Sequence, residues 1–186
     1  MFPIIEKISI PKTVSACIDV DVITFSSKDR ETFVRIPRPF EVSLDKSSFV
    51  VLSSSSSLDD SRKRNLRNVL PMSCTLKARI LQAMSGASSG YTQELDIVGV
   101  GYKVELKNDG KLLLKLGFSH DVLINIPENI EVACPKETMI ILKSSCKESL
   151  GSFVAYLKNS KALDVYKNKG VLVKGENLEK KKFKKK

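Results

Sequence analysis

Three neighbouring residues carry the side-chain types of a hydrolase triad: Ser119, His120 and Asp121. Successive side chains of an extended chain point to opposite faces, so this trio cannot form the relay in which a histidine lies between a nucleophile and a carboxylate. His120 is the only histidine of the chain and is expected to be a hydrogen-bonding turn residue. The sequence therefore predicts that the protein is not an enzyme.

The sequence also lacks complete motifs for dinucleotide binding, zinc binding or a disulfide framework. The run GVGYKV (99–104) is not a dinucleotide fingerprint, because its sixth position is Val104 and no helical pattern comes after it. The four cysteines show neither a CxxC pair nor a histidine at ligand spacing, and they are Cys17, Cys74, Cys134 and Cys146. That spacing predicts free thiols rather than a zinc site or a disulfide framework. We therefore expect no metal and no cofactor.

Charge is the strongest chemical feature that remains. The chain carries a net charge of +10, and the segment 158–186 holds +8 of it, with 11 lysines against three acidic residues. Such a cationic end predicts a polyanionic partner, although a tail that only keeps the protein soluble fits the composition equally well. No apolar run approaches the roughly 18 residues of a membrane span, and the N-terminus resembles neither a secretory signal nor a transit peptide.

Two short segments could bring backbone and side chains to such a partner. In ALDVYKNKGVLVK, Tyr166, Lys167 and Lys169 precede Gly170. Lysines supply phosphate contacts, tyrosine supplies a stacking face, and glycine admits a close approach of backbone N–H groups. Gly99 and Gly101 interrupt an apolar run, which indicates a bulge or a close approach of another group.

An internal repeat predicts the architecture that positions these segments. VRIPRPFEVSLDKSSFVVLSS (34–54) aligns without gaps on INIPENIEVACPKETMIILKS (124–144), at an offset of 90 residues and with 7 identities in 21 positions. A unit that occurs twice predicts two tandem, similar domains rather than one large domain. The expected boundaries are an N-terminal domain over 1–90, a C-terminal domain over 91–178 and a basic tail over 179–186.

Each domain is expected to be α+β, with an antiparallel-rich sheet covered by a helix. The expected strands are 9–11, 15–21, 22–26, 32–36, 41–43 and 49–53 in the first domain, and about 92–107, 111–118, 121–126, 130–134 and 138–144 in the second. Asn108, Asp109 and Gly110 predict a hairpin turn.

The helices are expected at the end of each domain. In the first, Ser73 is the expected N-cap and Pro71 is expected to stop the helix from extending backward, while Leu76, Ile80, Ala83 and Met84 form its apolar face. The stretch 53–70 is expected to be a flexible insertion, because it is serine-rich, charged and without periodicity. The second helix is expected over 147–159, with Leu150, Phe153, Val154 and Leu157 facing the sheet.

Two strings and one loop give the sequence a family resemblance. VGVGYKVEL (98–106) and LGFSH (116–120) at this separation resemble the L6 family of large-subunit ribosomal proteins, bacterial and organellar type, over at least 91–171. In the loop, the family carries an acidic residue led by Pro or Ser, then Tyr-Lys-Gly-Lys-Gly and an aliphatic residue. The chain keeps Asp164, Tyr166, Lys167, Lys169, Gly170 and Val171, but has Leu163 for Pro or Ser and Asn168 for Gly. Asparagine tolerates positive φ, so Asn168 is expected to preserve the turn.

The resemblance implies a structural constituent of the large subunit that binds large-subunit rRNA, chiefly through its second domain. It also implies a position near the factor-binding region, the sarcin–ricin loop and the stalk base, with that rRNA and neighbouring ribosomal proteins as partners and no small-molecule substrate or membrane. The residues expected to contact rRNA are Gly99, Gly101, Tyr102, Lys103, Ser119, His120, Tyr166, Lys167, Lys169, Gly170, Lys174, Lys180, Lys181 and Lys182.

Two questions stay open at this level. A free-standing regulatory RNA-binding protein outside the ribosome is the alternative to a ribosomal protein. The serine run, the lysine-rich and Trp-free composition and the departures in the loop predict a divergent, organelle-encoded mitochondrial protein, with plastid and bacterial cytoplasm as alternatives.

Overall fold

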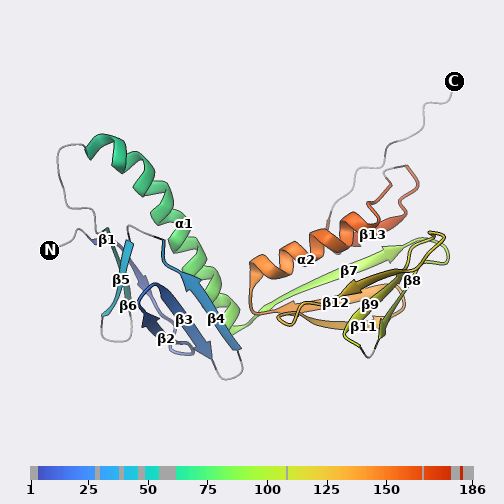
Figure 1. The fold of residues 1–186 in the computed structure, drawn as a ribbon, viewed down its shortest axis with the longest axis horizontal. Coiled ribbons are helices and arrows are strands. Elements are labelled where there is room, and N and C mark those ends of the chain that lie inside the picture. Colours follow the sequence, from blue (N-terminus) through green and yellow to red (C-terminus); the bar gives the residue numbers. More distant parts are fainter. Residues whose placement is uncertain are drawn as a thin grey trace. The chain divides into compact units, whose positions relative to one another are not determined.

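The computed structural model describes residues 4–27, 30–37, 40–45, 49–54, 62–107, 109–164, 166–176 and 181. It divides into two compact units, Met1–Gly90 and Tyr91–Lys186. Both units combine antiparallel sheets with one helix (Figure 1), which confirms the predicted α+β class.

In its described residues, the first unit has six strands and helix α1. The strands are β1 (Ile4–Ser9), β2 (Ser15–Asp19), β3 (Val22–Ser27), β4 (Arg30–Arg35), β5 (Phe40–Asp45) and β6 (Phe49–Ser54), and α1 spans Arg62–Ser88. They form two sheets with the orders β1-β6-β5 and β2-β3-β4. Helix α1 packs on β3 and β4, and the Thr32 hydroxyl donates a hydrogen bond to the Ala83 carbonyl at 3.0 Å.

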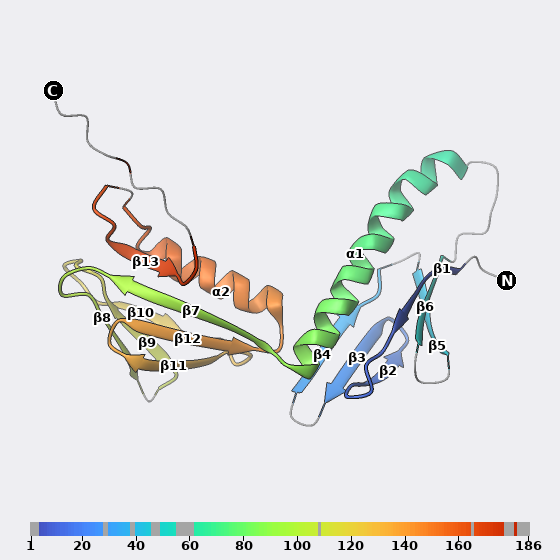
Figure 2. The same ribbon diagram turned by 180° about the vertical axis from the view of Figure 1, so that it is seen from behind.

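The described part of the second unit has seven strands and helix α2. The strands are β7 (Tyr91–Val98), β8 (Lys103–Lys107), β9 (Lys111–Lys115), β10 (Val122–Asn125), β11 (Glu131–Lys136), β12 (Met139–Ser144) and β13 (Gly170–Val173), and α2 spans Lys147–Ser160. The sheet orders are β10-β9-β8 and β11-β12-β7-β13. Figure 2 shows β13 running along β7, close to α2.

The repeat seen in the sequence is a repeated hairpin. Val42 pairs with Leu52 in the β5–β6 hairpin, and 90 residues later Val132 pairs with Leu142 in the β11–β12 hairpin. The turn that leads into each hairpin is also the same. The Phe40 N–H donates to the Pro37 carbonyl at 3.1 Å, and the Ile130 N–H donates to the Pro127 carbonyl at 3.0 Å. The shared identities therefore encode the same register over the first pairs of both hairpins, and β11–β12 departs from it at a register shift between Ala133 and Lys136.

Each unit has its own hydrophobic core. In the first, Ile23 and Phe25 of β3 meet the helical face formed by Leu76, Ile80 and Met84. In the second, Leu112 and Leu114 of β9 are fully buried with Ile140 and Leu142 of β12, and Leu150, Phe153 and Leu157 of α2 close that core. These helical faces have the spacing predicted from the sequence.

Three predicted elements were wrong in their bounds. The strand expected at 9–11 is β1, which spans Ile4–Ser9 and ends where that strand was expected to begin. Helix α1 does not begin after Pro71 but at Arg62, so residues 62–70 of the expected insertion are helical and Pro71 lies inside the helix. A proline inside a helix removes one hydrogen bond, but the straight-chain Arg, Lys and Leu residues before it favour the helix. The single strand expected at 92–107 is two strands, β7 and β8, separated by a turn.

Candidate nucleic-acid interface

Strand pairing, a hydrogen bond and a cation–π contact bring the three conspicuous segments of the sequence to one end of the second unit. Gly170 of β13 pairs with Val98 at the end of β7, so the loop before β13 lies beside the turn after β7. The Val171 N–H closes that loop on the Lys161 carbonyl at 3.1 Å. The Lys161 ammonium group in turn lies 4.2 Å from the centroid of the Phe118 ring. We call residues 98–102, 117–120 and 161–170 together the terminal cluster.

The 161–170 loop is held by its own hydrogen bonds. The Asp164 carboxylate accepts a hydrogen bond from the Tyr166 N–H at 2.9 Å, and the Asp164 carbonyl accepts one from the Asn168 N–H at 2.7 Å. The Asp164 N–H donates back across the loop to the Lys169 carbonyl at 3.0 Å. Asp164 is thus the centre of the turn, in the way that Asp side chains commonly stabilise turns.

The backbone conformations at Asn168 and Gly170 explain why these residue types occur in the loop. Asn168 has a φ of 52°, the only positive value at a non-glycine residue in the described part of the chain, which confirms that asparagine keeps the turn where the family prefers glycine. Gly170 has a φ of 147°, and a Cβ atom there would lie 2.7 Å from the Leu163 Cα. Gly170 is therefore required by the close crossing of the chain on itself, and its contact with RNA stays a prediction.

The glycines in the turn between β7 and β8 are also explained by contacts and backbone conformation within the chain itself. The Tyr102 N–H donates to the Gly99 carbonyl at 3.3 Å, and Gly101 has a φ of 77°, as the third residue of such a turn requires. A Cβ atom on Gly99 would lie 2.5 Å from the Tyr102 ring, and one on Gly117 would lie 2.9 Å from it. The expected close approach at Gly99 exists, and the approaching group is the ring of Tyr102, which lies against both glycines.

Aromatic and apolar side chains are exposed around these glycines. The rings of Phe118 and His120 are stacked, with centroids 5.9 Å apart and an angle of 17° between their planes. Phe118 is 42% exposed, Tyr166 51% and Val100 89%. Ser119 and His120 are exposed, as expected for residues that contact a partner.

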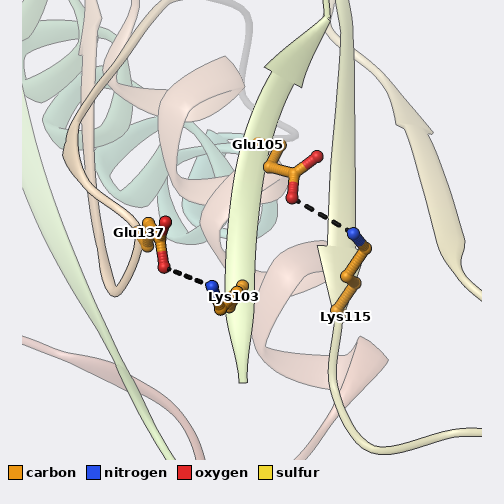
Figure 3. Close-up of polar contacts among 4 residues, drawn as sticks. All are labelled: Lys103, Glu105, Lys115 and Glu137. Carbon is orange, nitrogen blue, oxygen red and sulfur yellow. Dashed lines mark hydrogen bonds and ion pairs between the residues drawn. The ribbon is translucent and has the colours of Figure 1, made fainter. Parts of the chain in front are cut away.

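The lysines of the predicted site fall into two groups. Lys167 and Lys169 are exposed, and among the residues that the structure describes neither pairs with a carboxylate. Lys103 and Lys174 are paired. Lys103 lies 2.9 Å from Glu137 across the end of β8 (Figure 3), and Lys174 contacts Glu94. Lys167 and Lys169 therefore keep their charge available to an anion, whereas Lys103 and Lys174 are already neutralised.

Hydrogen bonding and charge attraction also shift the titration of the paired residues. Glu137 raises the pKa of Lys103, and Lys103 lowers the pKa of Glu137. Glu94 raises the pKa of Lys174 in the same way. Lys174 also lies at the far end of β13, about 13 Å along the strand from Gly170. The structure therefore separates Lys103 and Lys174 from the charge of the cluster.

The remaining differences from the sequence prediction concern the basic tail and two residues that were not predicted to belong to the site. Lys180 and Lys182 lie outside the described residues, and Lys181 is exposed. Lys161 and Phe118 were not predicted as site residues, although they connect the loop to the LGFSH segment. The only signal for Phe118 was its place beside His120 in that string, and Lys161 had none because its contact is made across 43 residues of chain.

Other kinds of site find little support in the described ranges. They contain no group of three or more His, Cys, Asp and Glu residues placed to hold a metal ion, and neither helix is long and apolar enough to cross a membrane. Two shallow hollows of about 420 Å³ lie away from the cluster, one beside the β8–β9 hairpin and one between α2 and the end of β13.

Comparison with known proteins finds relatives along nearly the whole chain. A family model described as ribosomal protein L6 matches residues 98–174. Relatives named large ribosomal subunit protein uL6 include those of Koribacter versatilis and Bordetella petrii, each 31% identical, and that of Rhizobium rhizogenes, 33% identical. These alignments cover 95–97% of this chain and 93–97% of the relatives. All three organisms are bacteria, so the mitochondrial assignment receives no support from them.

Proposed function

The chain belongs to the ribosomal protein L6 family, and from this we propose that it is a structural constituent of the large ribosomal subunit that binds large-subunit rRNA. The observation that carries the proposal is the terminal cluster. It gathers the VGVGYKVEL turn, the LGFSH segment and the 161–170 loop, which lie far apart in the sequence, at one end of one unit. Its free ammonium groups and exposed rings suit phosphates and bases.

The mechanism is scaffolding. Lys167 and Lys169 neutralise phosphates from a loop whose backbone is closed by hydrogen bonds at both ends, so their contacts are oriented rather than diffuse. Ordered rRNA at this place then supports the docking of translation factors. We propose the factor-binding region near the sarcin–ricin loop and the stalk base as its position, with neighbouring large-subunit proteins as further partners.

Family membership also bears on the other predictions. L6 proteins are structural ribosomal proteins and not enzymes, which confirms the prediction that the chain is not an enzyme. Among the three compartments considered, the bacterial sources of its relatives favour the bacterial cytoplasm, as a component of the ribosome there.

The experiment compares three variants of the full chain in binding to large-subunit rRNA and to scrambled RNA over a series of salt concentrations. Lys167→Ala with Lys169→Ala should weaken binding to the rRNA by about tenfold and binding to scrambled RNA much less, because oriented contacts are lost. Removing residues 180–186, with six lysines, should weaken binding to both RNAs alike and flatten the salt slope. Lys136→Ala with Lys143→Ala, which removes two exposed charges elsewhere in the unit, is the matched control.

Two results would contradict the proposal. If the loop variant and the control lost the same affinity, the cluster would have no special role. If the wild-type protein failed to sediment with large subunits after a moderate salt wash but still bound RNA, the free-standing regulatory RNA-binding protein would be the correct function.

A further inference from the structure

The Phe118–His120 pair is an arrangement that the fold itself does not need. Both rings lie outside the hydrophobic core of the unit, and they are nearly parallel, at 17°, with centroids 5.9 Å apart. That is the offset arrangement in which aromatic rings attract one another. His120 is exposed and Phe118 is 42% exposed, so flat ring surface is presented to solvent.

The pair is also held in a fixed place. Lys161 comes directly after the last turn of α2, and its carbonyl is tied to β13 by the Val171 N–H. Its ammonium group lies over the Phe118 ring at 4.2 Å from the centroid, within the range of a cation–π interaction. Lys161 thus connects the LGFSH segment to the end of the helix, and it places a positive charge over the face of the Phe118 ring.

The surroundings favour RNA over protein as the occupant. Lys161, Lys167 and Lys169 belong to one loop, and in the described part of the chain none of them pairs with a carboxylate. Cations beside exposed rings match the phosphates and bases of a nucleic acid, whose unpaired bases stack on aromatic side chains. In a regular duplex the faces of the bases are already covered by their neighbours, so a ring can reach only a base that is unpaired or splayed out.

We propose that the Phe118–His120 pair is a stacking platform for one unpaired nucleobase of the bound RNA, and that Lys161 is the residue that positions it. The inference rests on the proposed function and adds to it the class of RNA structure recognised. The base stacks on the ring pair, and the phosphates beside it meet Lys161 and the two lysines of the loop. His120 contributes a flat ring, so another aromatic residue can replace it.

The test uses the full chain and large-subunit rRNA, with binding measured by titration and base accessibility by chemical modification of unpaired bases. His120→Ala should weaken rRNA binding about tenfold, as expected for the loss of one stacked base. His120→Phe should stay within about twofold of the wild type. Lys161→Met should weaken binding by about threefold to tenfold, since it removes both the clamp and the charge. Tyr156→Ala, which removes an exposed aromatic ring from α2, is the matched control and should bind as the wild type does.

Modification of the RNA decides the mode of binding. At least one base should be protected by the wild type and by His120→Phe but become reactive with His120→Ala. The inference is overturned if no base behaves in this way, or if His120→Phe and His120→Ala lose the same affinity. It is also overturned if His120→Ala binds rRNA normally but fails to join large subunits, because the rings would then contact a protein. A wild-type protein that binds rRNA no better than scrambled RNA would instead refute the proposed function.

Discussion

The two units share one hairpin, with the same register up to the shift after Ala133 in β11, but they differ in the chain segments after their helices. After α1, only Ser89 and Gly90 precede β7, which leaves no room for another strand. After α2, the chain forms the 161–170 loop and adds β13 to the free edge of β7. The helices also pack differently, α1 on β3 and β4 and α2 on β7, β12 and β13. The repeat covers one hairpin of each unit, and the 161–170 loop of the candidate site lies in a segment of the second unit that has no counterpart in the first.

Net charge does not distinguish the two units. Residues 1–90 carry +4 and residues 91–186 carry +6. Within the described part of the second unit, Lys103, Lys115, Lys158 and Lys174 pair with carboxylates, whereas three lysines at one end do not: Lys161, Lys167 and Lys169. We therefore expect the local placement of charge, rather than its total, to determine RNA binding by the second unit.

Separating the units should give the largest effect. We expect the fragment 91–186 to bind large-subunit rRNA at least about a hundredfold more tightly than the fragment 1–90 at moderate salt, because only the former has the cluster. Titration of both fragments with the rRNA and with scrambled RNA measures this, after circular dichroism has shown that each is folded. Equal affinity of the two fragments for the rRNA would refute the comparison.

The second largest effect is expected from disturbing Gly170, where the 161–170 loop closes on β13. In Gly170→Ala, the new Cβ would lie 2.7 Å from the Leu163 Cα, in a backbone conformation that favours glycine. We expect a loss of about 2–3 kcal/mol in the free energy of unfolding of the second unit. Gly175→Ala is the matched control, because Gly175 also has a positive φ, of 89°, but open space around it, and it should lose about 1 kcal/mol.

Hydrogen exchange locates this effect. In Gly170→Ala, protection should fall in β13 and β7 and stay unchanged in β1–β6, which have no counterpart of the loop. Equal losses of stability in the two glycine variants would show that positive φ alone, and not the crossing with Leu163, determines the role of Gly170.

Local sequence patterns predicted an element of the fold well where one physical factor alone determined its structure. The repeat predicted the two hairpins, because strand register depends on the alternation of apolar residues. Asp109 and Gly110 lie in the turn between β8 and β9 as expected, with a φ of 67° at Gly110, whereas Asn108 lies outside the described residues. The predicted start of helix α1 was wrong because two local signals conflicted. Pro71 was expected to break the helix, but the residues before it have high helix propensity.

The sequence did not predict the tertiary contacts made by the candidate-site residues. Lys103 and Lys174 were chosen for their charge, but their carboxylate partners, Glu137 and Glu94, lie 34 and 80 residues away in the sequence. Gly99 was correctly expected to admit a close approach, but only the folded turn shows that Tyr102 makes it. Such pairings depend on tertiary contacts, which short sequence patterns do not contain.

The smallest expected effect concerns the segment after β13, another feature that the first unit lacks. The Lys158 ammonium group donates to both carboxylate oxygens of Glu176 at 2.8 Å, which ties this segment to α2. Hydrogen bonding to Lys158 lowers the pKa of Glu176 from its usual value of 4.5. Because the pair is about one-third exposed, Glu176→Gln should lower the melting temperature at pH 7 by only about 2 °C.

The pH dependence of this difference identifies its cause. A carboxylate whose pKa is lower in the folded state stabilises the fold above its unfolded pKa, and that stability is lost as the pH falls through the folded pKa. The gap between the wild type and Glu176→Gln should therefore be constant from pH 7 to about pH 5 and close below about pH 4.5. Glu128→Gln, at an exposed glutamate of the same unit, should show no such gap. A gap that widens toward low pH would show that the ion pair is not the contact that joins the segment after β13 to the helix.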